Sequence, residues 1–291
     1  MIPLTLSTGS LYTYGTARVF ELAARAGYDG LELMVDGHQD THQADYLRGL
    51  MDRYDLPILS VHSPFSSLRI VGWPDGEVAR VERSVALAEA LDARVVNLHL
   101  PLRIRDLVIT FARHGLRVPI PGPSDDQRRY WEWLAEGGLA TLQTKTQVEI
   151  VIENLPMRMF LGQRFSTAAM NTWAELAAFP QVCLDTTHCG TTGSDLVAVQ
   201  EMLADRISHV HLSDYATGRQ HLAVEHGALP LGQFLKALAT RNYAGIIVVE
   251  LAPRALPVHD EEELAAELRR NLAFCRQHLS QGSPGSTVAG D

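Results

Sequence analysis

The stretch QVCLDTTHCGTTGSDLVAVQEMLADRISHVHLSD, residues 181–214, contains one complete repeat of the dominant pattern in this chain. It opens with an apolar run that ends at Asp185 and continues through residues 195–206, where apolar side chains recur at helical spacing. A second apolar run follows and ends before Asp214. A strand, a helix and another strand in this order are typical of a parallel βαβ unit.

The same alternation runs along nearly the whole chain and predicts eight strand–helix units. The expected strands are 2–8, 29–35, 57–63, 93–100, 148–155, 181–188, 207–214 and 244–253. The expected helices are 16–27, 44–54, 76–91, 124–145, 167–179, 195–206, 229–242 and 260–279. Eight such units in 291 residues predict a single (β/α)8 barrel domain, a TIM barrel, over residues 1–279. We expect a long loop at 101–126, suited to a lid or a partner contact, and a flexible C-terminal tail at 280–291.

A doubly wound open sheet is the alternative α/β fold. It usually has a glycine-rich phosphate turn after its first strand, and the segment STGSLYTYG at 7–15 does not match that turn. The barrel is therefore the favoured architecture.

Composition restricts the functional class. The formal net charge of −9 argues against non-specific binding of nucleic acid, and three irregularly spaced cysteines favour a reducing compartment. The sequence shows neither a signal peptide nor a bilayer-spanning stretch, so we expect a cytoplasmic protein without a membrane partner. Trp131 and Trp133 cannot both face the core from one helix, which leaves one free to support a homo-oligomer interface.

Ionisable residues stand at the ends of seven of the expected strands, where a TIM barrel carries its chemistry. They are Glu32, His62, His99, Glu153, Asp185, His211 and Glu250. The last four come from consecutive strands, so three carboxylates and one imidazole would converge in an apolar mouth, where burial and repulsion are costly. A divalent metal ion removes both costs, and the pattern predicts a metal site at these four residues. The alternative is a hydrogen-bonded network without metal.

The sequence resembles the xylose-isomerase-like barrel superfamily, which includes sugar phosphate isomerases and epimerases, ketose 3-epimerases, inosose dehydratases and endonuclease IV. The resemblance covers residues 4–279 and is most specific in VIENLP, CLDTTHCGTTGSDL, HVHLSD and VVELAP. In the ketose epimerases, the metal ligands come from the fifth to eighth strands, and they match Glu153, Asp185, His211 and Glu250 one by one. The resemblance also implies that His188 and Arg219 bind substrate.

Endonuclease IV implies a larger ligand set around three zinc ions. His62 and His99 match its additional histidines, so they are candidates for a second metal or for substrate contact. His221 matches its late histidine, but Arg219 stands where an aspartate ligand is needed. Either the third site is lost, or Asp214 or another group replaces the missing ligand. Because the epimerase pattern tolerates an arginine there, the substitution favours the sugar enzymes.

We therefore expect a metal-dependent isomerase or epimerase of a small sugar, sugar phosphate, sugar acid or cyclic polyol. Glu153 and Glu250 would transfer a proton through an enediolate, while His188 and His221 bind substrate. Glu32 would either orient a ligand or bind substrate. One divalent ion is expected, with Zn²⁺ or Mn²⁺ favoured over Mg²⁺ or Co²⁺. The alternatives are an endonuclease IV-like zinc phosphodiester hydrolase acting on abasic DNA, and a barrel that binds a metabolite without turnover.

Overall fold

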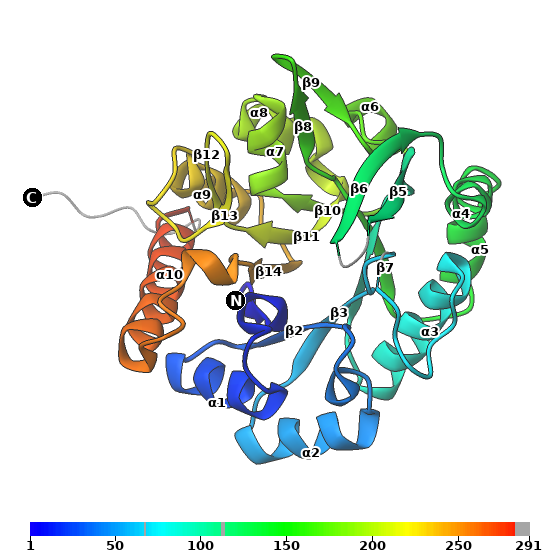
Figure 1. Ribbon diagram of the computed structural model, residues 1–291. Helices are drawn as coiled ribbons and strands as arrows, with labels where there is room; N and C mark the ends of the chain where they lie inside the picture. The colour runs from blue at the N-terminus through cyan, green and yellow to red at the C-terminus, as the bar shows by residue number, and fades with distance from the viewer. Residues whose placement is uncertain (67, 112–113, 283–291) are drawn as a thin grey trace, which may run out of the picture.

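Eight parallel strands close into a barrel in the computed structural model. The structure describes residues 1–66, 68–111 and 114–282, and for residues 105–119 and 160 it describes the backbone alone. In order around the barrel the strands are β1 (Leu4–Ser7), β2 (Gly30–Met34), β3 (Ile58–His62), β4 (Val95–His99), β7 (Glu149–Glu153), β10 (Val182–Asp185), β11 (Ile207–Leu212) and β14 (Ile246–Val249). Figure 1 shows the helices as a ring around these strands. The predicted TIM barrel is confirmed.

The helices mostly follow the expected alternation. They are α1 (Thr16–Ala26), α2 (Ala44–Tyr54), α3 (Glu77–Ala90), α4 (Asp125–Ala135), α5 (Gly138–Gln143), α6 (Trp173–Leu176), α7 (Thr186–Thr192), α8 (Leu196–Leu203), α9 (Leu231–Thr240) and α10 (Glu261–Gly282). Short 3₁₀ turns lie at Thr8–Leu11, Gln39–Thr41, Ala204–Arg206 and Pro253–Ala255. The helix expected at 124–145 divides into α4 and α5 because Gly137 adopts a left-handed conformation, with φ of 81°.

Three antiparallel hairpins extend the loops that follow β4, β7 and β11. They pair β5 (Ile104–Phe111) with β6 (His114–Pro121), β8 (Met157–Phe160) with β9 (Gln163–Ser166), and β12 (Asp214–Ala216) with β13 (Arg219–Leu222). The segment predicted as a long loop at 101–126 thus contains the first hairpin. In Figure 1 all three hairpins lie over the upper half of the barrel and none lies over β2 or β3.

The helix expected at 167–179 is wrong over its first half. The backbone of residues 167–169 instead bonds to the base of the first hairpin, because the Arg103 amide donates to the Thr167 carbonyl and the Ala169 amide donates to the Pro101 carbonyl. Only the single turn α6 remains, and the capping box of Thr172 and Glu175 begins it.

The C-terminal helix is longer than expected. It continues to Gly282, so the first three residues of the predicted tail at 280–291 are helical. Residues 283–291 lie outside the described part of the chain.

The barrel has a small apolar cluster of its own, formed by Val95, Val151, Cys183, Ile246 and Val248. The larger apolar core lies outside, between the strands and the helices. All three cysteines are buried and free. No helix in the described ranges is both long and apolar enough to cross a membrane.

The loop between β3 and α3 is held by one buried cation. Arg80 on α3 is 3% exposed, and its guanidinium donates hydrogen bonds to four loop carbonyls. The acceptors are the carbonyls of Phe65, Ser66, Leu68 and Pro74. Because Phe65 lies next to two histidines of the barrel mouth, Arg80 links the helix layer to the candidate site.

We expect Arg80→Met to lower the free energy of unfolding by about 2–4 kcal/mol, since four carbonyls lose a charged donor that methionine cannot replace. Urea denaturation followed by circular dichroism measures the change. Arg83→Met is the matched control, because Arg83 lies on the same helix, is exposed, and should change stability by less than about 0.5 kcal/mol. Equal urea midpoints for Arg80→Met and the parent protein would contradict the assignment.

Candidate metal centre

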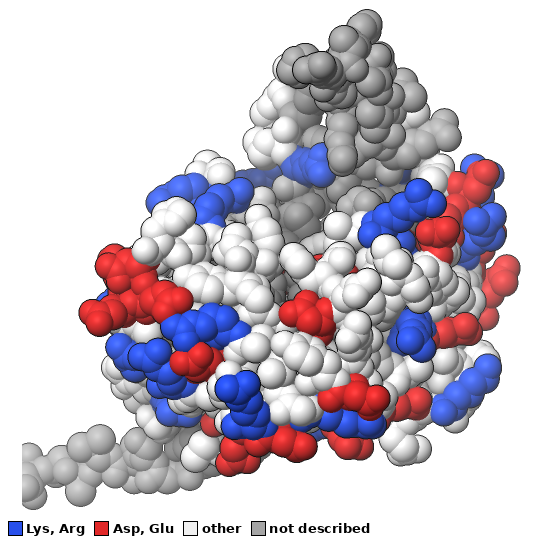
Figure 2. Space-filling model, turned by 60° about the horizontal axis from the view of Figure 1, so that its bottom comes forward, with Lys and Arg blue, Asp and Glu red and all other residues white. Residues whose placement is uncertain are grey.

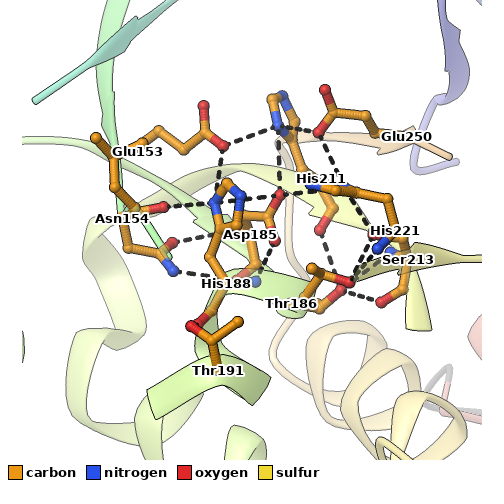
Figure 3. A network of polar contacts seen from close by, with 12 residues as sticks. Glu153, Asn154, Asp185, Thr186, His188, Thr191, His211, Ser213, His221 and Glu250 are labelled. Atoms are coloured by element: carbon orange, nitrogen blue, oxygen red, sulfur yellow. Dashed lines mark hydrogen bonds and ion pairs between the residues drawn. The ribbon is translucent and has the colours of Figure 1, made fainter. Parts of the chain in front are cut away.

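Strand register brings the four predicted ligands to one point in the mouth of the barrel. Asp185 is level with His211 on the neighbouring strand, and Glu153 ends β7. Glu250 follows β14 directly. One ligand atom from each of these four residues lies within 4.8 Å of the others, and Figure 3 shows the four side chains directed toward one another.

The imidazole of His211 stands between the three carboxylates. Its Nδ1 lies 2.9 Å from Oε2 of Glu250, 3.4 Å from Oε1 of Glu153 and 3.9 Å from Oδ2 of Asp185. These are ion-pair distances, yet neither Nδ1 of His211 nor Oδ2 of Asp185 makes a hydrogen bond within the described residues. Two buried polar atoms without hydrogen bonds, both facing the same point, are unusual in a folded protein.

The pKa shifts of the three carboxyl groups also fit a site that binds a cation. Burial would raise the pKa of Glu153, but His211 holds that pKa well below its usual range. Burial opposes ionisation of Glu250 too, yet His211 lowers its pKa to about 2. For Asp185 burial prevails and raises the pKa, and the charges of Glu153 and Glu250 raise it further. Three oxygen donors and one nitrogen donor with excess negative charge fit a divalent metal ion.

His188 is fixed by the turn that follows Asp185. The Asp185 carboxylate caps α7 by accepting from the His188 amide at 2.7 Å. The imidazole Nδ1 of His188 lies 2.8 Å from the carbonyl oxygen of Asn154, which leaves Nε2 as its other polar atom. Burial would lower the pKa of His188, but Asp185 and Glu153 raise it to about 9.

Two asparagines, besides the residues predicted from the sequence, hold the Glu153 carboxylate and the backbone of Asp185 in place. Asn97 on β4 donates to Oε2 of Glu153 at 2.6 Å. Asn154 accepts from the Asp185 amide and donates to the Asp185 carbonyl, so it fixes that strand end on both sides. The sequence could have pointed to Asn154, because this residue directly follows Glu153 in the motif VIENLP.

His62 and His99 form a second group with Glu153. The Nε2 atom of each histidine lies 3.4 Å from Oε2 of Glu153, and one ligand atom from each of the three residues lies within 4.8 Å of the others, close enough to share an ion. The Phe65 ring, 40% exposed, packs against both imidazoles with centroid distances of 5.7 and 4.8 Å. This side of the mouth therefore has an aromatic wall.

Glu32 lies beneath the ligands instead of at the surface of the mouth. It is fully buried, and its Oε2 accepts from Ser60 at 2.9 Å and pairs with Nε2 of His209 at 2.8 Å. Its Oε1 lies 3.0 Å from Nε2 of His211. Of its two expected roles, this position suits the orientation of a ligand.

The two predicted site residues that follow β11 lie in different places, His221 in the site and Arg219 on its rim. His221 joins Asp185 and His188 in a third group, and its backbone has the left-handed φ of 53°, which is uncommon outside glycine. Arg219 begins β13 and is exposed. Asp214 is not available as a replacement ligand, because its carboxylate accepts from the amides of Tyr215, Gly227 and Leu229. The third group thus keeps one carboxylate and two histidines.

The closed parallel barrel and the cluster of acids and histidines at its C-terminal end define a TIM barrel with a candidate metal centre. The chain belongs to the xylose isomerase-like TIM barrel family, whose model matches residues 20–278. An uncharacterized protein of Mycobacterium leprae (strain TN) is 30% identical over 300 residues, covering 96% of this chain and 98% of the relative.

Solved structures of low sequence identity share the fold. The 3-keto-D-glucoside 4-epimerase from E. coli has a TM-score of 0.66 and 18% identity, covering 95% of this chain and 100% of its own. AP endonuclease, family 2 from Brucella melitensis has a TM-score of 0.63 and 18% identity, covering 91% of this chain and 98% of its own.

Proposed function

We propose that this protein is a metal-dependent isomerase or epimerase acting on a small sugar, sugar phosphate, sugar acid or cyclic polyol. The observation that carries the proposal is the pair of glutamates, Glu153 and Glu250, whose carboxylate oxygens lie 3.4 and 2.9 Å from the same His211 nitrogen. The name of the E. coli neighbour, an epimerase of a keto-glucoside, supports the same class of substrate.

Glu153, Asp185, His211 and Glu250 would hold the divalent ion. When bound there, the ion supplies Lewis-acid stabilisation of the negative charge that develops on a substrate oxygen. The donor set of three carboxylates and one imidazole suits Mn²⁺ or Zn²⁺ and also accommodates Mg²⁺ or Co²⁺.

The two glutamates would exchange the substrate proton. One carboxylate removes the hydrogen from the carbon next to the substrate carbonyl, the electron pair moves onto the carbonyl oxygen, and an enediolate results. Return of a proton to the opposite face, or to the neighbouring carbon, gives the epimer or the isomer. Proton transfer by a positioned carboxylate contributes about 10²–10⁴-fold to such a rate.

The surroundings of the two glutamates differ. Both oxygens of Glu153 have polar neighbours, because Oε2 accepts from Asn97 and Oε1 faces His188 and His211. In Glu250, Oε2 faces His211, and no described residue pairs with Oε1. Glu250 is therefore the better placed of the two to reach a substrate proton, with His188 and His221 orienting hydroxyl groups and Arg219 holding the far end.

A phosphodiester hydrolase acting on abasic DNA is the second candidate. The group of His62, His99 and Glu153 favours it, because a second metal ion would stabilise the charge of a phosphate. The occupied carboxylate of Asp214 and the arginine at position 219 oppose it, since the third group lacks a second acid. Figure 2 shows basic and acidic side chains interspersed on the face it displays, where the coloured residues form no continuous basic band for a DNA backbone.

One paired experiment separates these functions. Protein loaded with Mn²⁺ or Zn²⁺ is incubated in D₂O with a panel of aldoses, ketoses, sugar phosphates, sugar acids and inososes, and proton NMR measures exchange of the hydrogen next to the carbonyl. A duplex with one abasic site is assayed in parallel. We expect exchange with at least one carbohydrate and no incision. Efficient, metal-dependent incision would promote the hydrolase, and binding of a sugar without exchange would indicate a passive binder.

A further inference from the structure

A buried acid from a strand three positions away around the barrel faces the histidine of the proposed metal site. Glu32 on β2 and His211 on β11 are both fully buried, and Oε1 of Glu32 lies 3.0 Å from Nε2 of His211. Neither of these two atoms makes a hydrogen bond to any described residue, and the contact between them is close in distance without hydrogen-bond alignment. Since buried polar atoms are almost always paired, each is the natural partner of the other.

The other oxygen of Glu32 is already engaged. Oε2 accepts from the Ser60 hydroxyl at 2.9 Å, and Nε2 of His209 lies 2.8 Å away. These two contacts reach Glu32 from β3 and β11, so the carboxylate is held from both sides. They fix its rotation and leave Oε1 directed at His211.

We propose that Glu32 is a positioning residue that keeps a proton on Nε2 of His211, so that Nδ1 presents its lone pair to the metal ion. The inference rests on the proposed metal centre and concerns a residue that touches neither substrate nor metal. Histidine ligands commonly donate their second N–H to a carboxylate, and loss of that carboxylate typically weakens metal binding by about 10–100-fold.

Glu32→Gln tests the idea without a change of size. Ser60 and His209 both donate, so they favour the amide oxygen at the position of Oε2. The amide NH₂ then faces Nε2 of His211, where two donors meet, and the imidazole has to move its proton to Nδ1. The ligand nitrogen is thereby blocked.

We expect the dissociation constant for Zn²⁺ or Co²⁺, measured by competition with a chelator, to rise by about 10–100-fold in Glu32→Gln. Glu267→Gln is the matched control. Glu267 is also a buried glutamate, but its partners are Arg270 and Asn271 on α10, so its replacement should leave the dissociation constant unchanged. Circular dichroism of the metal-free proteins checks that both variants fold.

A second measurement needs no variant. In the parent protein loaded with Zn²⁺ and labelled with ¹⁵N-histidine, the imidazole spectrum of His211 should show a protonated Nε2 and an unprotonated Nδ1. A protonated Nδ1, or an unchanged dissociation constant in folded Glu32→Gln, would overturn the inference. If the parent protein itself binds neither Zn²⁺ nor Co²⁺, the metal centre fails instead, which separates the two outcomes.

Discussion

Asp185→Asn protein should purify without a divalent ion, whereas we expect the parent protein to retain one. Asparagine keeps the shape of the side chain and remains a good helix N-cap, so α7 should still begin at the same residue. The change removes one negative charge and replaces one carboxylate oxygen by an amide group. We expect the metal dissociation constant to rise by more than about 100-fold, beyond the range found when only an outer partner of a ligand is lost.

The matched control is Asp195→Asn. Asp195 also caps a helix, since its carboxylate accepts from the amides of Val197 and Ala198 at the start of α8, but it stands outside the ligand cluster. Metal content by mass spectrometry of protein never exposed to chelator, followed by chelator competition, compares the two variants with the parent. Full, tight occupancy in Asp185→Asn would remove Asp185 from the ligand set. An equal loss in Asp195→Asn would show that the loss of metal does not depend on membership of the ligand cluster.

Glu250→Gln should abolish most of the exchange of the substrate's α-hydrogen with solvent deuterium. The amide preserves size and can still approach the metal through its oxygen, but it has no basic oxygen to take a proton. We expect the exchange rate to fall by about 10²–10⁴-fold at saturating metal. The exchange assay is suitable because it reports the proton transfer itself, whatever the net product.

Metal content has to be measured beside activity, because Glu250 is also a proposed ligand. Glu153→Gln is the companion variant and should lose exchange as well if the two glutamates act on opposite faces of the substrate. Glu263→Gln, on the exposed start of α10, controls for the loss of one negative charge. Exchange at the parental rate by metal-loaded Glu250→Gln would remove the residue from catalysis. A broad carbohydrate panel that shows no exchange with the parent would count against the whole proposal.

The barrel could be predicted because its signals are local. Apolar runs with acids or histidines at their ends recur between helical stretches, and each unit can be identified within about 30 residues. The hairpins could not be found in the same way. Residues 167–169 have a composition that allows a helix, but their backbone hydrogen bonds to residues 101 and 103 replace helical ones, and such distant contacts leave no periodic trace.

The ligand candidates were also visible before the fold, because an ionisable residue after a buried strand is conspicuous for its chemical type. Their partners were not. Asn97 and Asn154 are ordinary polar residues in the sequence, and only barrel closure directs their amides at Glu153 and Asp185. Asp214 illustrates the reverse case, since its residue type suits a ligand while the folded turn engages both of its carboxylate oxygens.

Glu32 shows which properties of a residue follow from the local sequence and which depend on the tertiary structure. Its place at a strand end follows from the alternating pattern, which depends on neighbours a few residues away. Its contact with His209, 177 residues further along the chain, depends on the closure and stagger of eight strands. Residue type and strand position are therefore properties of the local sequence. The direction of a carboxylate, the partner it finds and the nitrogen of His211 that it faces arise only when the barrel closes and excludes water from its interior.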